Sequence, residues 1–136
     1  WWVFLSAIFR LGNQVANLIA NKHKLNFLED FMIIHMVLFK FEEPVTADFE
    51  ETFEYHCEQI RQHCEGVILF DLKKNFSDRA GGFVYALSSI FKDVESLERY
   101  QPHPVHEELK KYLNNFPGQR VVYDGELGAD SLVTPL

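Results

Sequence analysis

The sequence predicts an α+β domain in which helices cover one face of a four-stranded antiparallel sheet. Three observations support this fold class: a long apolar run from Met32 to Phe41, an amphipathic helix pattern after it, and two more strand-like segments before a second helical stretch. The chain has 136 residues, of which 47% are hydrophobic, so one domain can bury a substantial core.

The run from Met32 to Phe41 predicts a buried strand, because it is continuous, apolar and rich in β-branched and aromatic residues. Successive side chains of a strand point to opposite faces. One face carries Ile33, His35, Val37, Phe39 and Phe41, and the other carries Ile34, Met36 and Leu38. Both faces therefore need a cover, and helices on one side supply only one of them.

A helix is expected next. Pro44 breaks the chain, Thr46 is a suitable N-cap, and the helical pattern continues to about Glu65 before Gly66 ends it. Its apolar side chains recur every three or four residues. They are Phe49, Phe53, Cys57, Ile60 and Cys64. This spacing puts them on one helix face, which is typical of a helix that packs against a core.

Two strands and a loop come after this helix. Residues 67–75 form the second predicted strand, residues 76–82 a loop, and residues 83–91 the third strand. Asp93 can then cap a short helix that reaches Tyr100, and a further helical stretch is predicted at residues 104–113.

A Phe-Pro-Gly turn at residues 116–118 leads to a fourth predicted strand at residues 119–123. The chain after Gly125 is expected to be loop or docked coil. The complete order is strand, helix, strand, strand, helix, strand, which is the split βαβ pattern of a ferredoxin-like fold.

The N-terminal extension, residues 1–31, is not assigned to this domain. Its apolar side chains recur at helical spacing, at Phe4, Ile8, Leu11, Val15 and Leu18. Three interpretations stay open: a leader upstream of a start at Met32, a docked or self-associating helix, and a truncated membrane anchor. The domain is predicted to span residues 32–127, and residues 128–136 form a tail.

Composition excludes some partners. The formal charge is −7 and the pI is about 5.3, whereas phosphate backbones need a basic surface, so no nucleic acid is expected. The apolar start of the chain is too short to span a bilayer, so no membrane is expected either. Thirteen Phe residues are more than a small domain hides easily, which favours a homodimer interface or an apolar cavity.

Cys57 and Cys64 are predicted to be buried free thiols. Seven residues along a helix separate their Cα atoms by roughly 10 Å, beyond the limit of about 7 Å for a disulfide. Nothing indicates an oxidising compartment, so the protein is expected in the cytoplasm. Zinc needs three or four convergent ligands, which the spacing of His56 and His63 does not supply, so no metal or cofactor is expected.

The most informative motif is residues 100–106, Tyr-Gln-Pro-His-Pro-Val-His. Its prolines restrict the backbone. A phenol and an imidazole are the neutral side chains best able to pass protons near neutral pH. The motif is compatible with an acid/base site at Tyr100 and His106, and also with a proline-broken helix junction that carries solvated histidines.

The motif resembles the signature of the stress-responsive A/B barrel domain (Dabb) family, which has a Tyr-Gln-x-His-Pro-x-His segment at this place. The His of the first strand, followed by an apolar run that ends in Phe-Lys, agrees with the family, as do Gly-Val at residues 66–67 and Gly-Phe at residues 82–83. The resemblance covers about residues 32–127. It implies a homodimer in which two sheets pack face to face as a dimeric α/β barrel.

The resemblance also implies a site. One plant member, olivetolic acid cyclase, closes a polyketide chain with the Tyr and the final His of the motif, which correspond to Tyr100 and His106. His106 would be the base, and Tyr100 would donate a hydrogen bond to a carbonyl or enolate oxygen. His35 is either a core histidine or a ligand anchor. The implied ligand-binding residues are His35, Val37, Phe39, Phe53, Tyr85, Leu87, His103, Leu109 and Val122.

Three functions stay open on the sequence. The first is a protein with an apolar cavity that binds, with or without acid/base processing, a small hydrophobic or carbonyl-containing molecule. The second is a non-catalytic stress-associated protein in which the motif is a structural clasp. The third is a monooxygenase-like protein that acts on aromatic substrates. The environment of Tyr100 and His106, an enclosed cavity or solvent, discriminates between them.

Overall fold

The computed structural model describes Gln14, residues 31–131 and Val133. The chain divides into two units, one of residues 31–127 and the other of residues 1–30 and 128–136. The helix predicted for the N-terminal extension lies outside the described residues. The fold and the candidate site belong to the first unit.

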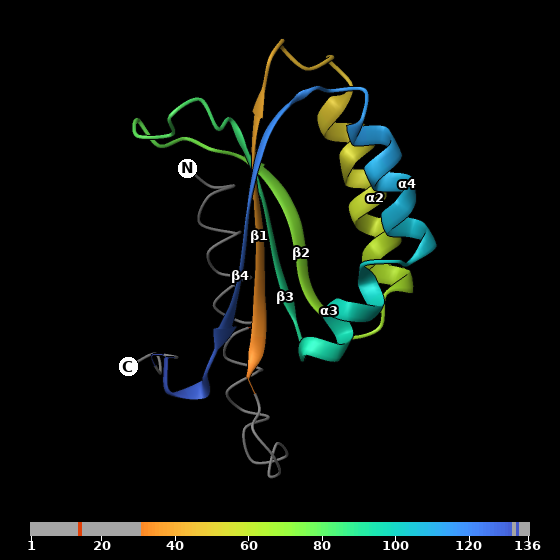
Figure 1. Ribbon diagram of the computed structural model, residues 1–136, viewed down its shortest axis with the longest axis vertical. Helices are drawn as coiled ribbons and strands as arrows, with labels where there is room; N and C mark the ends of the chain where they lie inside the picture. Colours follow the sequence, from red (N-terminus) through yellow and green to blue (C-terminus); the bar gives the residue numbers. More distant parts are fainter. Residues whose placement is uncertain (1–13, 15–30, 132, 134–136) are drawn as a thin grey trace. The chain divides into compact units, whose positions relative to one another are not determined.

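Residues 31–127 contain strands and helices in the predicted order (Figure 1). The strands are β1 (Met32–Phe41), β2 (Val67–Lys74), β3 (Tyr85–Phe91) and β4 (Gly118–Leu127). The helices are α2 (Phe49–His63), α3 (Val94–Tyr100) and α4 (Pro104–Leu113), and a short 3-10 turn, Ala129–Ser131, follows β4. All three helices lie on one face of the sheet (Figure 1). This is the predicted ferredoxin-like α+β fold.

The sheet has the strand order β2-β3-β1-β4, and all neighbouring strands are antiparallel. The predicted buried strand, β1, is therefore a central strand, paired on both sides. In this register His35 lies between Ser89 of β3 and Asp124 of β4. The polar side chain of the apolar strand thus has a polar neighbour on each side.

The core lies between the sheet and the helices. β1 alternates as predicted, with Ile33, His35, Val37 and Phe39 buried toward the helices. The apolar stripe of α2 meets them, and its Phe49, Phe53, Cys57 and Ile60 are fully buried. Both cysteines are buried free thiols, as expected, and burial raises the pKa of Cys57 to about 12.

One of the two predicted helix caps is correct. The Asp93 carboxylate accepts the backbone N–H of Ser96 at 2.7 Å and caps α3. The prediction for α2 is wrong: the helix begins at Phe49 after Asp48, and Thr46 contributes only its carbonyl, which accepts the Phe49 N–H at 3.1 Å. Residues 46–48 therefore form a tight turn ahead of the helix instead of its first turn.

β4 is longer than predicted. The strand runs from Gly118 to Leu127, whereas residues 119–123 were expected, with loop after Gly125. Each residue of β4 pairs with one of β1, from Gly118 opposite Phe41 to Leu127 opposite Met32. Backbone pairing to a long central strand outweighs the poor strand propensity of Asp and Gly.

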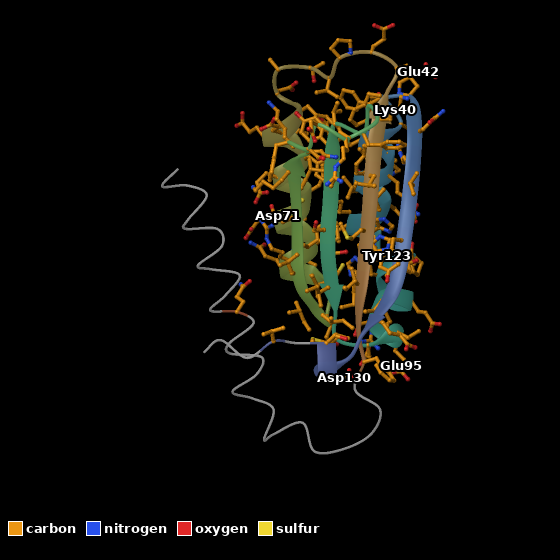
Figure 2. All side chains as sticks on the ribbon, turned by 90° about the vertical axis from the view of Figure 1, so that its left-hand side faces the viewer. Lys40, Glu42, Asp71, Glu95, Tyr123 and Asp130 are labelled. Atoms are coloured by element: carbon orange, nitrogen blue, oxygen red, sulfur yellow. The ribbon has the colours of Figure 1, made fainter. Side chains whose placement is uncertain are left out.

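The second face of the sheet carries no helix among the described elements, and Figure 2 looks onto it. The labelled residues Asp71 of β2 and Tyr123 of β4 mark the two edge strands in that view. Its central apolar side chains, Ile34, Met36, Leu38 and Ile90, are only partly buried. We call this surface the open face. Within the described part of the chain, no helix is long and apolar enough to cross a bilayer.

Candidate functional site

The motif at residues 100–106 joins two helices. α3 ends at Tyr100, and α4 begins at Pro104 with His103 as its N-cap. His103 accepts the Val105 N–H through Nδ1 at 3.2 Å, and its own N–H donates to the Tyr100 carbonyl at 3.0 Å. Proline suits the first helical position because no amide donor is needed there. The junction is therefore held by a backbone hydrogen bond to α3 and a side-chain hydrogen bond to α4.

Tyr100 is a core residue, with only 1% of its surface exposed. Its ring packs against Phe91 and Phe70, with ring centroids 5.0 and 5.7 Å away. Burial raises the pKa of the Tyr100 hydroxyl well above its ordinary value, with the nearby Cys64 and Cys57 adding to the effect. Tyr100 is therefore a neutral hydrogen-bond donor at any physiological pH.

His106 stacks on Tyr100. The two ring centroids are 4.0 Å apart, and the rings are within 25° of parallel. His106 Nδ1 donates a hydrogen bond to the Gln101 carbonyl at 2.9 Å. In the neutral ring this leaves Nε2 as the unprotonated nitrogen. Burial lowers the pKa of His106, and the hydrogen bond to Gln101 acts in the opposite direction.

His35 also packs against Tyr100. Its ring centroid is 6.0 Å from that of Tyr100, in an edge-on arrangement, and the side chain is buried. His35 Nδ1 donates a hydrogen bond to the Asp124 carboxylate. Asp124 keeps 47% of its side chain exposed. The buried His35 is therefore connected to the protein surface through Asp124.

We call His35, Tyr100, His106 and Asp124 the Tyr–His cluster. It combines one protonated phenol, two imidazoles and one carboxylate on the helix-covered face of the sheet, where β1 pairs with the edge strand β4. Asp124 was missed from the sequence, because the predicted fourth strand ended one residue before it. If the fourth strand is extended past Asp124 and paired antiparallel with the first strand, Asp124 comes to lie opposite His35. That extended pairing is the signal that could have found Asp124.

The other predicted ligand-binding residues are distributed differently. Val37, Phe39, Phe53, Leu87 and Leu109 belong to the packed core between sheet and helices. Tyr85 is also buried, but its hydroxyl donates to Glu50 at 2.7 Å. Val122 lies on β4 with 54% of its surface exposed.

Two pockets include some of the predicted site residues, Tyr100 and His103 in one and Tyr85 in the other. One, of about 210 Å³, is lined by His63, Cys64, Glu65, Arg99, Tyr100 and His103. The other, of about 180 Å³, is lined by Glu50, Glu54, Leu72, Lys73, Lys74 and Tyr85. The first brings Tyr100 and His103 together, and neither contains the predicted residues Val37, Phe39 or Phe53. Among the described residues, no three His, Cys, Asp or Glu side chains converge as metal ligands.

The sequence model of the stress responsive A/B barrel domain matches residues 33–127 of this chain. An uncharacterised protein of Streptomyces coelicolor is 33% identical over 79 residues, which cover 56% of this chain and 80% of that protein.

Solved structures agree in fold. A dimeric protein of unknown function with a ferredoxin-like fold from Bacteroides fragilis has a TM-score of 0.60 and 23% identity, over 71% of this chain and 96% of that one. A hydroxynitrile lyase from Passiflora edulis has a TM-score of 0.64 and 15% identity, over 79% of this chain and 100% of that one.

Proposed function

Because this chain belongs to the stress-responsive A/B barrel domain family, we propose that it binds a small hydrophobic or carbonyl-containing molecule at the Tyr–His cluster and promotes proton transfer on it. The stack of His106 on Tyr100, with His106 Nδ1 held by the Gln101 carbonyl, is the observation that carries this proposal. It puts a neutral base next to a neutral donor in a partly buried setting.

The two side chains have complementary roles. His106 Nε2 removes a proton from the carbon next to the carbonyl of the bound molecule, and negative charge then develops on the carbonyl oxygen. Tyr100 donates a hydrogen bond to that oxygen and stabilises the enolate. A phenol whose pKa is raised by burial stays protonated and does not lose its donor. A histidine whose pKa is lowered by burial stays neutral and can accept the proton.

Asp124 and His35 support this arrangement. Since Asp124 accepts the Nδ1 proton of His35, the neutral His35 ring carries its lone pair on Nε2. We assign His35 the role of orienting the bound molecule. The fold is compatible with catalysis, since the Passiflora edulis protein of the same fold is an enzyme.

We further propose that the protein works as a homodimer in the cytoplasm. The open face has apolar side chains that no described helix covers, and the Bacteroides fragilis protein of the same fold is dimeric. Two buried free thiols suit a reducing compartment.

The test uses 4-phenylbutan-2-one, an apolar ketone with slowly exchanging hydrogens next to its carbonyl. Proton NMR in deuterated buffer follows the loss of those signals with the full-length protein present. General acid/base catalysis typically contributes about 10²–10⁴-fold, so we expect His106→Gln and Tyr100→Phe each to reduce the protein-dependent exchange rate at least about tenfold.

Tyr55→Phe is the matched control for Tyr100→Phe, because it makes the same chemical change at an exposed tyrosine of α2. It should leave the exchange rate unchanged. Exchange that is no faster with protein than without it would refute the proton-transfer proposal. Mass spectrometry of small molecules that co-purify with the protein would then report whether binding occurs without chemistry.

A non-catalytic clasp is the second candidate, and a specific observation favours it. The same groups close the α3–α4 junction: Tyr100 fills the core beside Phe70 and Phe91, and His106 holds the Gln101 carbonyl. In that case Tyr100→Ala and His106→Ala, which remove the ring contacts and the hydrogen bond to Gln101, would lower the melting temperature, no exchange would be seen, and no small molecule would co-purify.

A further inference from the structure

We propose that the pocket at the junction of α2, α3 and α4 binds the carboxylate of a small organic acid. We call it the junction pocket, and its lining residues are His63, Cys64, Glu65, Arg99, Tyr100 and His103. The inference deepens the proposed function and rests on it in one respect: Tyr100 belongs to both sites, so acids held here are the class of molecule expected at the Tyr–His cluster.

The size of the junction pocket favours a small ligand. Its volume is about 210 Å³, whereas sites for drug-sized ligands usually measure roughly 300–1,000 Å³. Four of its six lining residues are His, Glu or Arg, and the other two are Cys64 and Tyr100, so the pocket offers both polar groups and an aromatic ring to a ligand.

Arg99 supplies the main contact for an anion. Its guanidinium donates to Ser96 Oγ at 3.2 Å, and among residues 31–131 it forms no ion pair. The Asp93 carboxylate, which binds the same Ser96 hydroxyl, also attracts the Arg99 charge without a direct ion pair. A carboxylate ligand would therefore have to make the two-pronged contact with the remaining N–H groups of Arg99 in place of this weaker attraction.

His103 adds a second donor. Because its Nδ1 accepts the Val105 N–H, its neutral ring carries the proton on Nε2. His103 also caps the N-terminus of α4, a ten-residue helix whose aligned peptide dipoles put partial positive charge at that end. Arg99 and His103 thus present donors to the junction pocket from two different helix ends.

Glu65 acts against an anion. It is the carboxylate of the junction pocket, and α2 and α3 also direct the negative ends of their dipoles there. The charge preference of the pocket is therefore the decisive measurement: direct hydrogen bonds from Arg99 must outweigh these repulsions.

Three probes that have nearly the same shape but different charges measure this preference. Benzoate is an anion, benzamide is neutral and benzamidine is a cation. Calorimetric titration of the full-length protein should show that benzoate binds at least tenfold more tightly than either of the others. Amide NMR shifts caused by benzoate should centre on residues 63–65 and 99–103. Tighter binding of benzamidine, or shifts centred elsewhere, would overturn the proposal.

Variants separate the contact with Arg99 from a structural role. Arg99→Gln should weaken benzoate binding at least tenfold, whereas Arg99→Lys should restore part of the loss. Glu65→Gln should strengthen benzoate binding, because it removes the opposing charge. Arg79→Gln, the same change at an exposed arginine of the β2–β3 loop, should have no effect. Equal loss in the Arg79 and Arg99 variants would show that net charge alone is responsible and would overturn the proposal.

The two proposals fail in different ways. If benzoate binds as expected but ketone exchange is absent, the proton-transfer function falls and the junction pocket stands. If ketone exchange depends on Tyr100 and His106 but none of the three probes binds with a preference for the anion, the junction pocket falls and the proton-transfer function stands.

Discussion

Tyr100 shows how one side chain can have two roles. Its ring fills the core, and its hydroxyl is the protonated partner of a stacked histidine. Deleting the whole side chain would therefore test packing and chemistry together, which is why the proposed substitution removes the hydroxyl alone. The same reasoning applies to His106, where Gln preserves a side-chain donor for the Gln101 carbonyl.

The titration of His106 predicts a dependence of stability on pH. An unfolded histidine titrates near pH 6.5, and burial lowers the pKa of His106 in the folded protein. The unfolded chain then binds the proton first as pH falls, so the contribution of His106 is present above about pH 6.5 and is lost below it. We expect the difference in unfolding free energy between wild type and His106→Gln to shrink between about pH 7.5 and about pH 5.

Urea unfolding of both proteins at the two pH values measures this difference. His56, whose pKa burial also lowers, is present in both proteins and cancels. A difference that grows toward low pH would mean that His106 gains a negatively charged partner instead of losing solvent.

Gly66 is the residue where backbone geometry is most demanding. Its φ is +85°, and an added Cβ would lie 2.0 Å from Ser96 Oγ. We expect Gly66→Ala to cost about 2–5 kcal/mol, the sum of left-handed strain and overpacking. Gly81, with φ +61° and open space around its Cα, should cost only about 1 kcal/mol as Gly81→Ala. Similar costs for the two variants by thermal or urea unfolding would contradict the role of Ser96.

At the scale of elements, α2 follows its sequence pattern closely. The predicted stripe is buried, and the acidic residues between its members, Glu50, Glu51, Glu54 and Glu58, are exposed. The aromatic members do most of the packing, since the Phe49 ring contacts Phe53, Tyr85 and Phe116.

A matched pair on α2 tests that packing. Phe49→Ala should cost about 3–5 kcal/mol, the usual range for emptying a buried aromatic site. Tyr55→Ala removes an aromatic side chain that is 60% exposed on the same helix, and it should change stability by less than about 0.5 kcal/mol. Urea unfolding of the two variants gives both numbers. Comparable losses would mean that Tyr55 is covered, for example by a partner chain.

At the scale of the whole molecule, the open face is the apolar surface that no described helix covers. Its apolar side chains are typical of a surface that another layer covers. A stable interface of this kind buries roughly 1,200–2,000 Å² or more.

We expect light scattering to report a dimer at micromolar concentration. Leu38→Glu puts a charge in the centre of the open face and should weaken the dimer more than about tenfold, because burying an unpaired carboxylate is costly. Tyr55→Glu, on the helical side, should leave the dimer intact. A well-folded wild-type monomer would refute the homodimer.

Residues 1–31 are expected to be dispensable for the fold, because Met32 begins a complete ferredoxin-like unit. Deleting them should change the unfolding free energy by no more than surface substitutions do, about 0.5 kcal/mol. A loss above about 3 kcal/mol would show that the extension contributes to the core, since only core changes reach that size.

The sequence by itself determined the element order, the alternation of β1 between two apolar faces, the stripe of α2 and the cap at Asp93. These features depend on period and local chemistry, which adjacent residues specify. The motif at residues 100–106 likewise pointed to the helix junction and to Tyr100 and His106, because prolines restrict a junction locally.

Only the tertiary structure decided the length of β4, the pairing of Asp124 with His35 and the filling of the space around Val37, Phe39 and Phe53. Asp124 is 89 residues from His35 in the chain, and no local propensity could select it. Long-range pairing supplies ladder hydrogen bonds that overrule the local preference for a loop. Packing likewise depends on how side chains from several distant elements fit together, which neighbouring residues in the sequence do not specify.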